Sequence, residues 1–347
     1  MAYDVEEAAR KARATREFMA DHGIRGGWTN ASLVDRALAK GIDVSATERG
    51  RVRVRQGNRS YWFSGGRTNF NRPMAFRAAR YKEVSSALLL SRGISAPRNA
   101  VFGAGDVTRA WRWAEELSPL VLKPSNANQG KMVHVGITDR AEFHNAFDAI
   151  ASSYDRVLVE QFVAGVEHRI AVVNYQVVAA TRRVPAHVVG DGTSDVEALV
   201  AKKNKARQAP HNLIHQQLSI DAPSLRELRR QDLDVNSIPK SGQMVYLRST
   251  SNIHTGGDAV DATDDLTARE VRFVERAARS FPGLRLAGFD VLLPRSGNGQ
   301  RPHILEINGS PMISMHHYPA EGKSRDVAGH LLEAMFPSTT NDRGGMR

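Results

Sequence analysis

Short apolar runs separated by tight turns dominate the chain after residue 119, and this pattern constrains the fold more than any other feature. The runs at 119–124 and 156–163 have the length of strands and are bounded by polar or turn-forming residues. The stretch 167–184 holds two such runs that meet at Asn174-Tyr175, which indicates a hairpin. Because strands joined by short turns pair antiparallel, the sequence predicts an α+β fold with mixed, mainly antiparallel sheets.

The remaining elements follow from the same periodicities. Apolar or alternating runs predict further strands at 51–55, 60–63, 131–137, 244–249, 286–294 and 303–309. Apolar spacing near one helical turn predicts helices over 4–20, 31–42, 75–91, 139–150, 267–281 and 325–336, with two more in the polar stretch 193–240. The polar tail at 337–347 is expected to be disordered. Together these elements indicate three lobes.

Composition excludes several classes of protein. The chain has no cysteine, so disulfides, thiolate metal sites and cysteine nucleophiles are absent. No apolar run is long enough to span a membrane, and the N-terminal stretch lacks the apolar core of a secretory signal. We therefore expect a cytoplasmic protein with no membrane partner.

The formal net charge of +11 has two interpretations. A basic surface attracts nucleic acid or another polyanion. Alternatively, the charge reflects an arginine-rich composition together with a site that binds a triphosphate. The basic residues are scattered, and neither a clustered basic stripe nor an aromatic stacking platform is evident. We therefore favour the second interpretation and expect no specific nucleic-acid partner.

Three oxygen-bearing side chains near the C-terminus form the strongest local signal. Asp290 lies in one predicted strand, and Glu306 and Asn308 lie in the next, with Asn298-Gly299 suited to a tight turn between them. Because 298 is midway between 290 and 306, the two carboxylates should lie nearly opposite each other. Glu306 and Asn308 should share one face of their strand. Oxygen donors on one rigid face suit Mg²⁺, although an exposed acidic hairpin without a metal remains an alternative.

A second candidate site follows the strand at 119–124. Lys123 ends this strand, and the loop SNANQGK that follows could place backbone N–H groups and a lysine against phosphates. The segment is not a Walker loop, because no Gly-Lys-Ser/Thr opens a helix there. Glu160–Val163 ends another strand whose edge could contact adenine, and Glu167 could bind ribose hydroxyls. Taken alone, the loop after Lys123 is explained equally well as an ordinary surface hairpin. Lys82, by itself, is explained as a solvated surface charge.

The order of these features resembles the ATP-grasp ligases, from Lys82 to Pro311. Several stretches are similar to the ATP-grasp part of cyanophycin synthetases, namely LVLKPSNANQGKMV, VLVEQFVAGVEHRIAVV, VVAATRRVPAHVVGDGTSDVEALV, GQMVYLRSTSNIHTGGDAVDATD, GFDVLL and EINGSPM. The resemblance implies an ATP-grasp fold of three lobes, with ATP between the central and C-terminal lobes. Their expected bounds are 1–80 for the N-terminal lobe, 81–163 for the central lobe and 164–336 for the C-terminal lobe.

The resemblance also implies roles for individual residues. ATP is expected to contact Lys82, Lys123, Ser125, Asn128, Gln129, Gly130, Lys131, Glu160, Gln161, Val163 and Glu167. Two Mg²⁺ ions are expected on Asp290, Glu306 and Asn308. Arg248 and Lys123 are expected to act on the transferring phosphoryl group. Substrate contacts are expected at Arg182, Arg183, His187, Asn252, Thr255, Gly256 and Gly257, and one of the adjacent arginines must point away if their strand is regular.

The sequence departs from the cyanophycin synthetases in three places. Ala127 and Met132 stand where related phosphate loops carry glycine, which affects how the loop closes. The stretch AKKNKARQAPHNLIHQQ after Val200 differs from the acidic run expected there, so the substrates are open. No second phosphate loop or Mur-ligase-like domain follows, so two-step polymerisation is not expected of this chain alone.

The function that the resemblance implies is ATP-dependent amide-bond formation. A carboxylate of an amino acid or peptide would become an acyl phosphate, and an amine would attack it with release of ADP and phosphate. A homodimer is the default expectation for such an enzyme. The alternatives are a catalytically inactive ATP-binding regulatory module and a basic nucleic-acid-binding protein.

Overall fold

The computed structural model of the chain describes residues 2–3, 5–125, 132–295 and 301–337. The helices are α1 Val5–Asp21, α2 Trp28–Ala39, α3 Pro73–Arg80, α4 Lys82–Ser91, α5 Val107–Ala114, α6 Arg140–Ala151, α7 Val196–Arg207, α8 Ala222–Arg229, α9 Ala268–Arg279, α10 Ser314–His317 and α11 Val327–Met335, with 3₁₀ turns at Glu115–Leu117 and Ile253–Thr255. Within these parts of the chain, no helix combines the length and the apolar character needed to cross a bilayer.

The strands form five antiparallel sheets. Their bounds are β1 Ala2–Tyr3, β2 Asp43–Ala46, β3 Val52–Gln56, β4 Arg59–Ser64, β5 Arg67–Thr68, β6 Asn99–Gly103, β7 Leu120–Pro124, β8 His134–Ile137, β9 Arg156–Gln161, β10 Val166–Val173, β11 Gln176–Val184, β12 His187–Val189, β13 Met244–Tyr246, β14 Asp258–Asp261, β15 Leu286–Leu293, β16 His303–Asn308 and β17 Ser324–Arg325. Among the described strands every ladder is antiparallel, which confirms the predicted α+β class.

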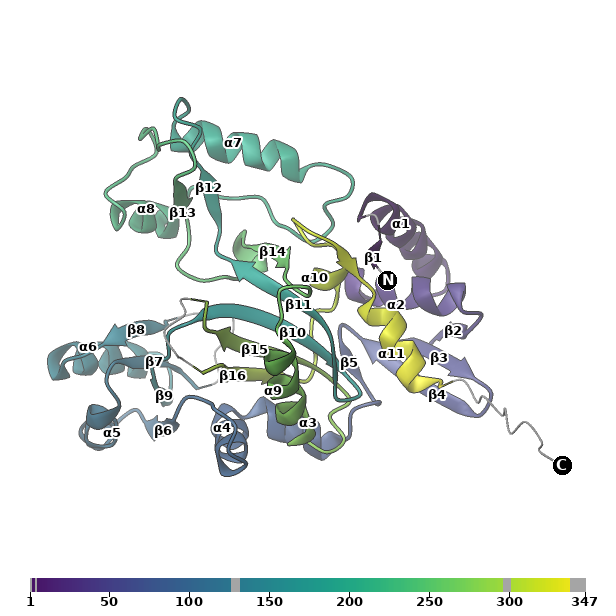
Figure 1. The fold of residues 1–347 in the computed structure, drawn as a ribbon, viewed down its shortest axis with the longest axis horizontal. Coiled ribbons are helices and arrows are strands. Elements are labelled where there is room, and N and C mark those ends of the chain that lie inside the picture. The colour runs from purple at the N-terminus through teal and green to yellow at the C-terminus, as the bar shows by residue number, and fades with distance from the viewer. Residues whose placement is uncertain (1, 4, 126–131, 296–300, 338–347) are drawn as a thin grey trace.

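A five-stranded sheet in the order β14-β11-β10-β15-β16 occupies the centre of the molecule (Figure 1). One face packs on α3, α4 and α9 through a core that includes Phe289 and Val291. The other face packs on α2 and α11 through residues such as Ala171 and Leu286. All eight residues of β15 are buried, so this strand is fixed on both faces and can hold a side chain precisely.

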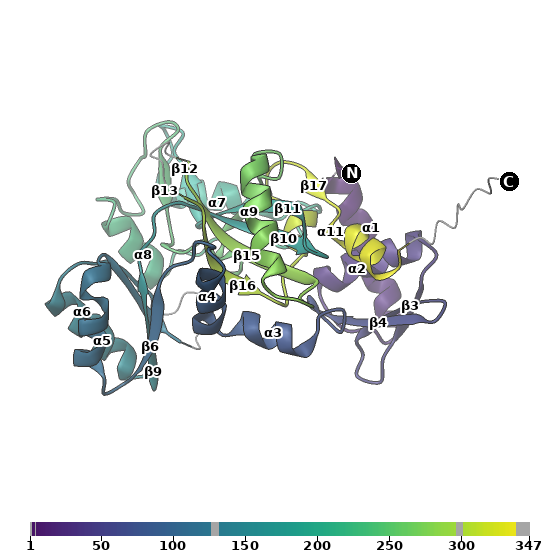
Figure 2. The ribbon, with the colours of Figure 1, turned by 60° about the horizontal axis from the view of Figure 1, so that its bottom comes forward.

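Two smaller sheets lie at opposite ends of the molecule (Figure 2). At one end, the sheet β6-β9-β7-β8 packs on α5 and α6 around Phe143 and Phe147. At the other end, β2-β3-β4-β5 packs on α2 around Phe63 and Val54. A third unit, β12 and β13 with α7 and α8, has its own apolar cluster around Val245 and rises from the end of β11.

The structure corrects one predicted element and adds others. The single helix predicted over 75–91 is two helices, because Tyr81 has an extended backbone with φ −89° and ψ 111°. The hairpin at Asn174-Tyr175 is confirmed, and both residues have positive φ as such a turn requires. The short elements β6, α5, β12, β14 and α10 were not predicted, because each is too short to show a clear periodicity. The predicted turn at Asn298-Gly299 and the tail after 337 lie outside the described residues.

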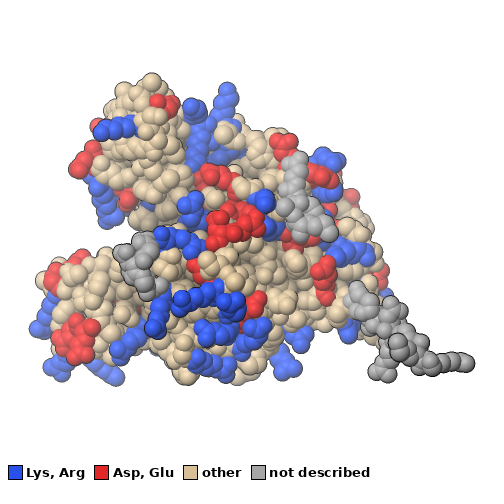
Figure 3. All heavy atoms as spheres, viewed as in Figure 1, with Lys and Arg blue, Asp and Glu red and all other residues tan. Residues whose placement is uncertain are grey.

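Arginines that are scattered along the sequence gather on one face of α9. The helix buries Phe273, Val274 and Ala277 against the central sheet. Its opposite face exposes four arginines, at positions 269, 272, 276 and 279, and Figure 3 shows basic side chains over this region. The expectation that the chain has no clustered basic stripe is therefore wrong for this face.

Candidate functional site

The central sheet brings four charged side chains onto one face. Asp290 of β15 lies directly opposite Glu306 of β16, which confirms the predicted register. On its other side Asp290 lies opposite Arg169 of β10, and Arg169 lies opposite Thr181 of β11. Arg183 is two residues after Thr181, so it extends from the same face.

Asp290 is buried and held by two arginines. The Nε and Nη2 groups of Arg169 both donate to its carboxylate, the latter at 3.0 Å, and Nη2 of Arg183 lies 3.3 Å from Oδ2. Burial alone would raise the pKa of Asp290, but Arg169 and Arg183 hold it below its ordinary value. The carboxylate is therefore ionised, with two positive charges beside it.

The other two predicted metal ligands also have partners. Nζ of Lys82, the first residue of α4, lies 3.3 Å from Oε2 of Glu306. Oδ1 of Asn308 accepts a hydrogen bond from the backbone N–H of Ser310 at 2.9 Å. Asn308 lies opposite Gly288, two pairing positions beyond Glu306. Among the described residues no group of three or more His, Cys, Asp or Glu side chains could hold a metal ion, and the predicted set contains only two such residues, because its third member is an asparagine.

The donor set fits Mg²⁺ in its chemistry. Asp290, Glu306 and Asn308 offer only oxygen atoms, two of them carried by carboxylates on adjacent strands. Lys82 and the two arginines are paired with these carboxylates. A bound metal would therefore replace or share these ion pairs, and the three cationic groups would become available to an anion.

The smaller sheet β6-β9-β7-β8 presents a second polar group. Nζ of Lys123 donates to Oε1 of Glu160 at 2.8 Å, and the Glu160 side chain is only 4% exposed. Its other oxygen is buried without a hydrogen-bond partner, as is Oδ1 of Asn99, which lies directly opposite on β6. Two buried acceptors without donors are costly in a folded protein, which is consistent with a ligand that donates hydrogen bonds there.

The remaining predicted nucleotide contacts are only partly described. Gln161 ends β9, and its backbone N–H bonds the carbonyl of Arg98, while Val163 follows in the connection to β10. Ser125 donates its backbone N–H to Arg156. The predicted phosphate-loop residues Asn128, Gln129, Gly130 and Lys131, together with Ala127, lie outside the described residues. Met132 is described and has a positive φ of 51°, a conformation that glycine adopts more readily.

Glu167, on β10 of the central sheet, is linked to Asp290 through Arg183. Arg183 donates to its carboxylate, and the Ser251 hydroxyl donates to its other oxygen at 2.7 Å. Nε of Arg183 is buried and has no partner. Arg183 therefore links Glu167 to Asp290 and retains one donor for a further group. Arg182, its neighbour, is exposed, so the two arginines do point to opposite faces.

Arg248 makes its contacts elsewhere. Its guanidinium pairs with Asp221 at 2.8 Å and bonds Ser219 at 3.0 Å, and it also bonds Ser224. Asp221 and Ser224 form the capping box of α8. The expected catalytic role of Arg248 stays a prediction, whereas Arg169 and Arg183 are the arginines that contact Asp290.

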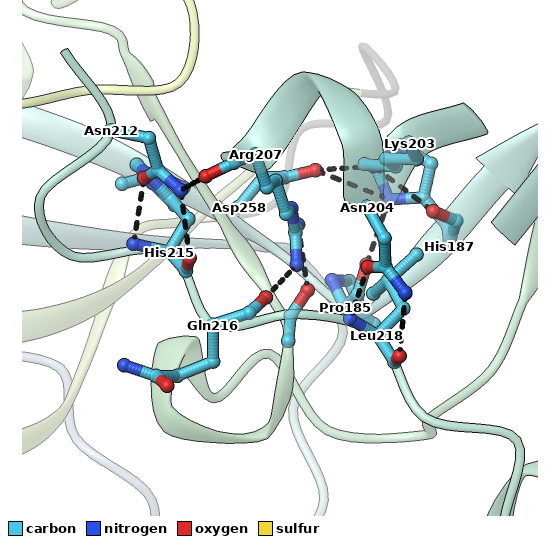
Figure 4. A network of polar contacts seen from close by, with 12 residues as sticks. Pro185, His187, Lys203, Asn204, Arg207, Asn212, His215, Gln216, Leu218 and Asp258 are labelled. Carbon is cyan, nitrogen blue, oxygen red and sulfur yellow. Dashed lines mark hydrogen bonds and ion pairs between the residues drawn. The ribbon is translucent and has the colours of Figure 1, made fainter. Parts of the chain in front are cut away.

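A second buried carboxylate, Asp258, lies near His187, one of the other predicted substrate residues (Figure 4). Asp258 accepts Nζ of Lys203 at 2.6 Å and is also bonded by Arg207. His187 lies 3.8 Å from it, and Arg207 donates to the carbonyl of Gly256 at 2.9 Å. Gly257 and Thr255 bond the carbonyl of Asn252, which closes the turn beside this network.

Charge and burial oppose each other in this network. Burial raises the pKa of Asp258, but Lys203 and Arg207 outweigh it and hold the pKa below its ordinary value. Burial lowers the pKa of Lys203 despite the pull of Asp258. Burial and then Lys203 lower the pKa of His187, so this imidazole is neutral at pH 7. The network therefore carries one excess positive charge.

The residues that the sequence interpretation missed are Arg169, Asn99, Asp258, Lys203 and Arg207. A signal existed for Arg169, because it follows Glu167 by two residues and so shares its face of the strand. No local signal existed for the others, because their partners are distant in sequence. Lys203 and Asp258 are 55 residues apart.

Comparisons with known proteins show which sequences this chain is similar to. Residues 79–194 match the model of the RimK-like ATP-grasp domain. The chain is 30% identical to a cyanophycin synthetase from Geminocystis herdmanii over 359 residues, an alignment covering 99% of this chain and 40% of the relative. It is 28% identical to the glutathione biosynthesis bifunctional protein GshAB of Mannheimia succiniciproducens, over 89% of this chain and 42% of the relative.

A solved structure shares the fold. The crystal structure of a bifunctional glutathione synthetase from Pasteurella multocida aligns with a TM-score of 0.70 and 25% identity, covering 90% of this chain and 44% of that chain. The chain thus spans about two fifths of the length of these relatives.

Proposed function

We propose that this chain, which carries a RimK-like ATP-grasp domain, is an ATP-dependent ligase that joins a carboxylate to an amine through an amide bond. The observation that carries the proposal is the face shared by Asp290, Glu306, Arg169 and Arg183. It combines oxygen donors for a cation with guanidinium groups for an anion. Phosphoryl transfer to a carboxylate needs both, because negative charge is redistributed among phosphate oxygens.

The nucleotide would lie between the central sheet and the sheet that carries Lys123. We place the adenine edge at Glu160, Gln161 and Val163, where the free oxygen of Glu160 can accept a hydrogen bond from an amino group. Glu167 would bind the ribose, and Lys82 and Lys123 the phosphates. We also propose that the loop at 125–131 contacts ATP and that the lobe boundaries lie after residues 80 and 163. Figure 3 shows a hollow in the surface between the α5–α6 and α7–α8 lobes.

Asp290, Glu306 and Asn308 would hold two Mg²⁺ ions. When bound, these ions supply charge neutralisation and orientation for the phosphates. Arg169, Arg183 and Lys82, released from the carboxylates, would then face the phosphoryl group and the acyl phosphate. Loss of one such preorganised charge typically costs about 10²–10³ in rate.

The reaction would proceed in two steps. A carboxylate oxygen attacks the γ-phosphorus of ATP, the bond to ADP breaks, and an acyl phosphate forms. The amine nitrogen then attacks the acyl carbon, phosphate leaves with the carboxylate oxygen, and the amine loses a proton. We place the carboxylate substrate near Arg183 and the amine substrate toward His187 and the turn from Asn252 to Gly257. The substrates would be amino acids or short peptides, and we further propose a cytoplasmic homodimer.

The test is ATP turnover over a matrix of amino acids and short peptides, with mass spectrometry of the products. A ligase gives ADP, phosphate and a product lighter by one water than the sum of one particular pair. With an ¹⁸O-labelled carboxylate, one labelled oxygen must appear in the released phosphate. The variant Glu306→Gln should lose this product while retaining the fold.

The alternatives give different outcomes. Tight ATP binding with no product from any pair would favour the regulatory module and overturn the ligase. Unlabelled phosphate from an ¹⁸O-labelled substrate would exclude an acyl phosphate. Salt-sensitive binding of RNA or DNA without ATP binding would favour the nucleic-acid alternative.

A further inference from the structure

The segment 308–311 begins with the predicted metal ligand Asn308 and is held by residues that are 238 and 245 positions away in the sequence. Oδ1 of Asn308 accepts the backbone N–H of Ser310 at 2.9 Å, so the direction of this side chain depends on where Ser310 lies. Ser310 itself lies beyond the last residue of β16. The contacts that fix it come from residues 65–71, between the end of β4 and the start of α3.

Asn71 is 4% exposed and uses both ends of its side-chain amide. Its Oδ1 accepts the backbone N–H groups of Arg285 and Leu286 at 2.7 and 2.8 Å. Its Nδ2 donates to the carbonyl of Leu286 at 2.8 Å and to the carbonyl of Gly309 at 3.1 Å. The side chain therefore joins the start of β15 to the residue that follows Asn308.

Asn71 takes the place of a strand residue where the β15–β16 ladder stops. The last pair of that ladder is Gly288 with Asn308, and Leu286 lies two residues beyond it. In an antiparallel ladder, a hydrogen-bonded residue exchanges both its N–H and its C=O with one partner. Leu286 makes that exchange with the Asn71 amide, and the same amide also holds Gly309. Asn71 thus fixes the spacing of the two strands at the end next to Asn308.

The turn at Gly65 and Gly66 contacts the same segment. The Ser310 hydroxyl donates to the carbonyl of Gly65 at 3.3 Å. A Cβ on Gly66 would lie 2.2 Å from the carbonyl oxygen of Pro311, which is closer than real Cβ contacts come. The turn is itself anchored, because the N–H of Gly65 donates to Oδ1 of the buried Asn30 at 2.8 Å. Any side chain at position 66 would therefore push the segment 310–311 away from its place.

Two further contacts complete the surroundings of this segment. A Cβ on Gly309 would lie 2.7 Å from Cδ2 of Phe76, so the backbone of Gly309 is in direct contact with that ring on α3. A Cβ on Gly288 would lie 3.1 Å from Cβ of Pro311 and 2.9 Å from Cδ of Arg169. Pro311 and the Arg169 side chain thus lie beside the same glycine. A displacement of Pro311 would therefore also reach Arg169.

We propose that Asn71 and Gly66 are positioning residues for Asn308, and that they set how tightly the proposed magnesium site holds its ions. Both act through the segment 309–311. The inference rests on the proposed function, because it requires Asn308 to be a metal ligand. Residues that hold a metal ligand in place orient it, and loss of such a contact typically lowers metal affinity by about 10–100-fold.

The test compares Gly66→Ala with Gly65→Ala in the full chain. Both glycines have a positive φ, of 91° and 54°, so both substitutions strain the turn. Only position 66 brings the new Cβ against Pro311, because nothing lies within 4 Å of a Cβ at position 65. Binding of Mn²⁺ is measured by electron paramagnetic resonance with the β,γ-methylene analogue of ATP present, and binding of the analogue without metal by calorimetry.

Gly66→Ala should raise the dissociation constant for Mn²⁺ by about tenfold or more and leave that of the analogue without metal within about twofold. Gly65→Ala should leave both constants near the parent values. Hydrogen exchange of the Ser310 backbone N–H should be faster in Gly66→Ala alone, because its bond to Asn308 loosens. If a thermal melt shows that Gly66→Ala unfolds, the same measurements on Asn71→Ser decide the question. Asn69→Ser is then the control, since Asn69 accepts the Trp62 N–H at 2.8 Å.

Equal Mn²⁺ affinity in Gly66→Ala and Gly65→Ala would overturn the proposal. A parallel loss of affinity for Mn²⁺ and for the analogue would also overturn it, because it would indicate a structural role only. If the parent chain binds the analogue but no Mn²⁺, the metal assignment fails and this proposal fails with it. The exchange rate of the Ser310 N–H separates these cases, since a contact that positions Asn308 changes that rate whether or not a metal binds.

Discussion

Two buried aspartates on the central sheet, Asp290 and Asp258, have similar surroundings. Asp290 is 6% exposed and paired with Arg169 and Arg183. Asp258 is 5% exposed and paired with Lys203 and Arg207. In each case two cations outweigh burial and keep the carboxylate ionised.

The two networks differ in the polar atoms that they leave unsatisfied. Around Asp290 and the facing sheet, Nε of Arg183, Oε2 of Glu160 and Oδ1 of Asn99 are buried without partners. In the Asp258 network, no described side-chain atom is buried in this way. Unsatisfied buried groups cost stability and are retained where a ligand completes them. This difference is consistent with the proposed phosphoryl transfer at the first network and predicts a structural role for Asp258 in the second.

The largest expected effect is on catalysis through Asp290. Asp290→Asn should reduce turnover of Mg·ATP by on the order of a thousandfold, about 4 kcal/mol in the barrier, because it removes a charged oxygen ligand. Steady-state kinetics over a magnesium titration would measure this. Asp264→Asn is the control, since Asp264 pairs with Lys323 on the surface. Turnover within tenfold of the parent would contradict the assignment of Asp290.

A smaller effect is expected on stability through Asp258. Asp258→Asn should lower the free energy of unfolding by on the order of 3 kcal/mol, because Lys203 and Arg207 would lose their shared anion. Urea denaturation would measure the loss. Adding Lys203→Met should recover part of it, as a double-mutant cycle of coupled charges requires. A loss below about 1 kcal/mol would mean that the network is not structural.

The smallest expected effect is on the pH dependence of the free energy of unfolding, through His215. His215 has a pKa of about 4 in the fold and about 6.5 when unfolded, so the unfolded chain binds more protons between these values. The contribution of His215 to the free energy of unfolding is complete above about pH 6.5 and is lost as the pH falls through 4. At pH 5 the part lost is about 2 kcal/mol.

The measurement is urea denaturation at pH 7.5 and pH 5. His316 and His317, whose pKa values burial lowers to about 3 and about 4, add to the loss in the same direction. Burial also lowers the pKa values of His168, His187 and His303, which add to the loss in the same direction. His215→Gln should therefore remove only its own share, about 2 kcal/mol of the difference between pH 7.5 and pH 5. An unchanged pH dependence in that variant would show that His215 is not neutral in the fold.

Local spacing was enough to place part of the site. The positions of Asp290 and Glu306 on either side of a turn predicted their pairing, because a two-stranded hairpin fixes register by counting. The opposite directions of Arg182 and Arg183 followed from the alternation of a strand. The break at Tyr81 could not be predicted, because the apolar spacing continues across it and the buried faces of α3 and α4 decide the turn.

The sequence by itself determined the fold class, the hairpins and the order of the polar motifs, since these depend on periodicity and turn chemistry within a few residues. Only the tertiary structure decided which charges meet. Arg169 contacts Asp290 across 121 residues, and Arg207 contacts Asp258 across 51. Electrostatic energy depends on distance and burial, and neither is set by local spacing. The pattern of strands determined where the carboxylates stand, and packing of the sheets and α7 determined which cations hold them.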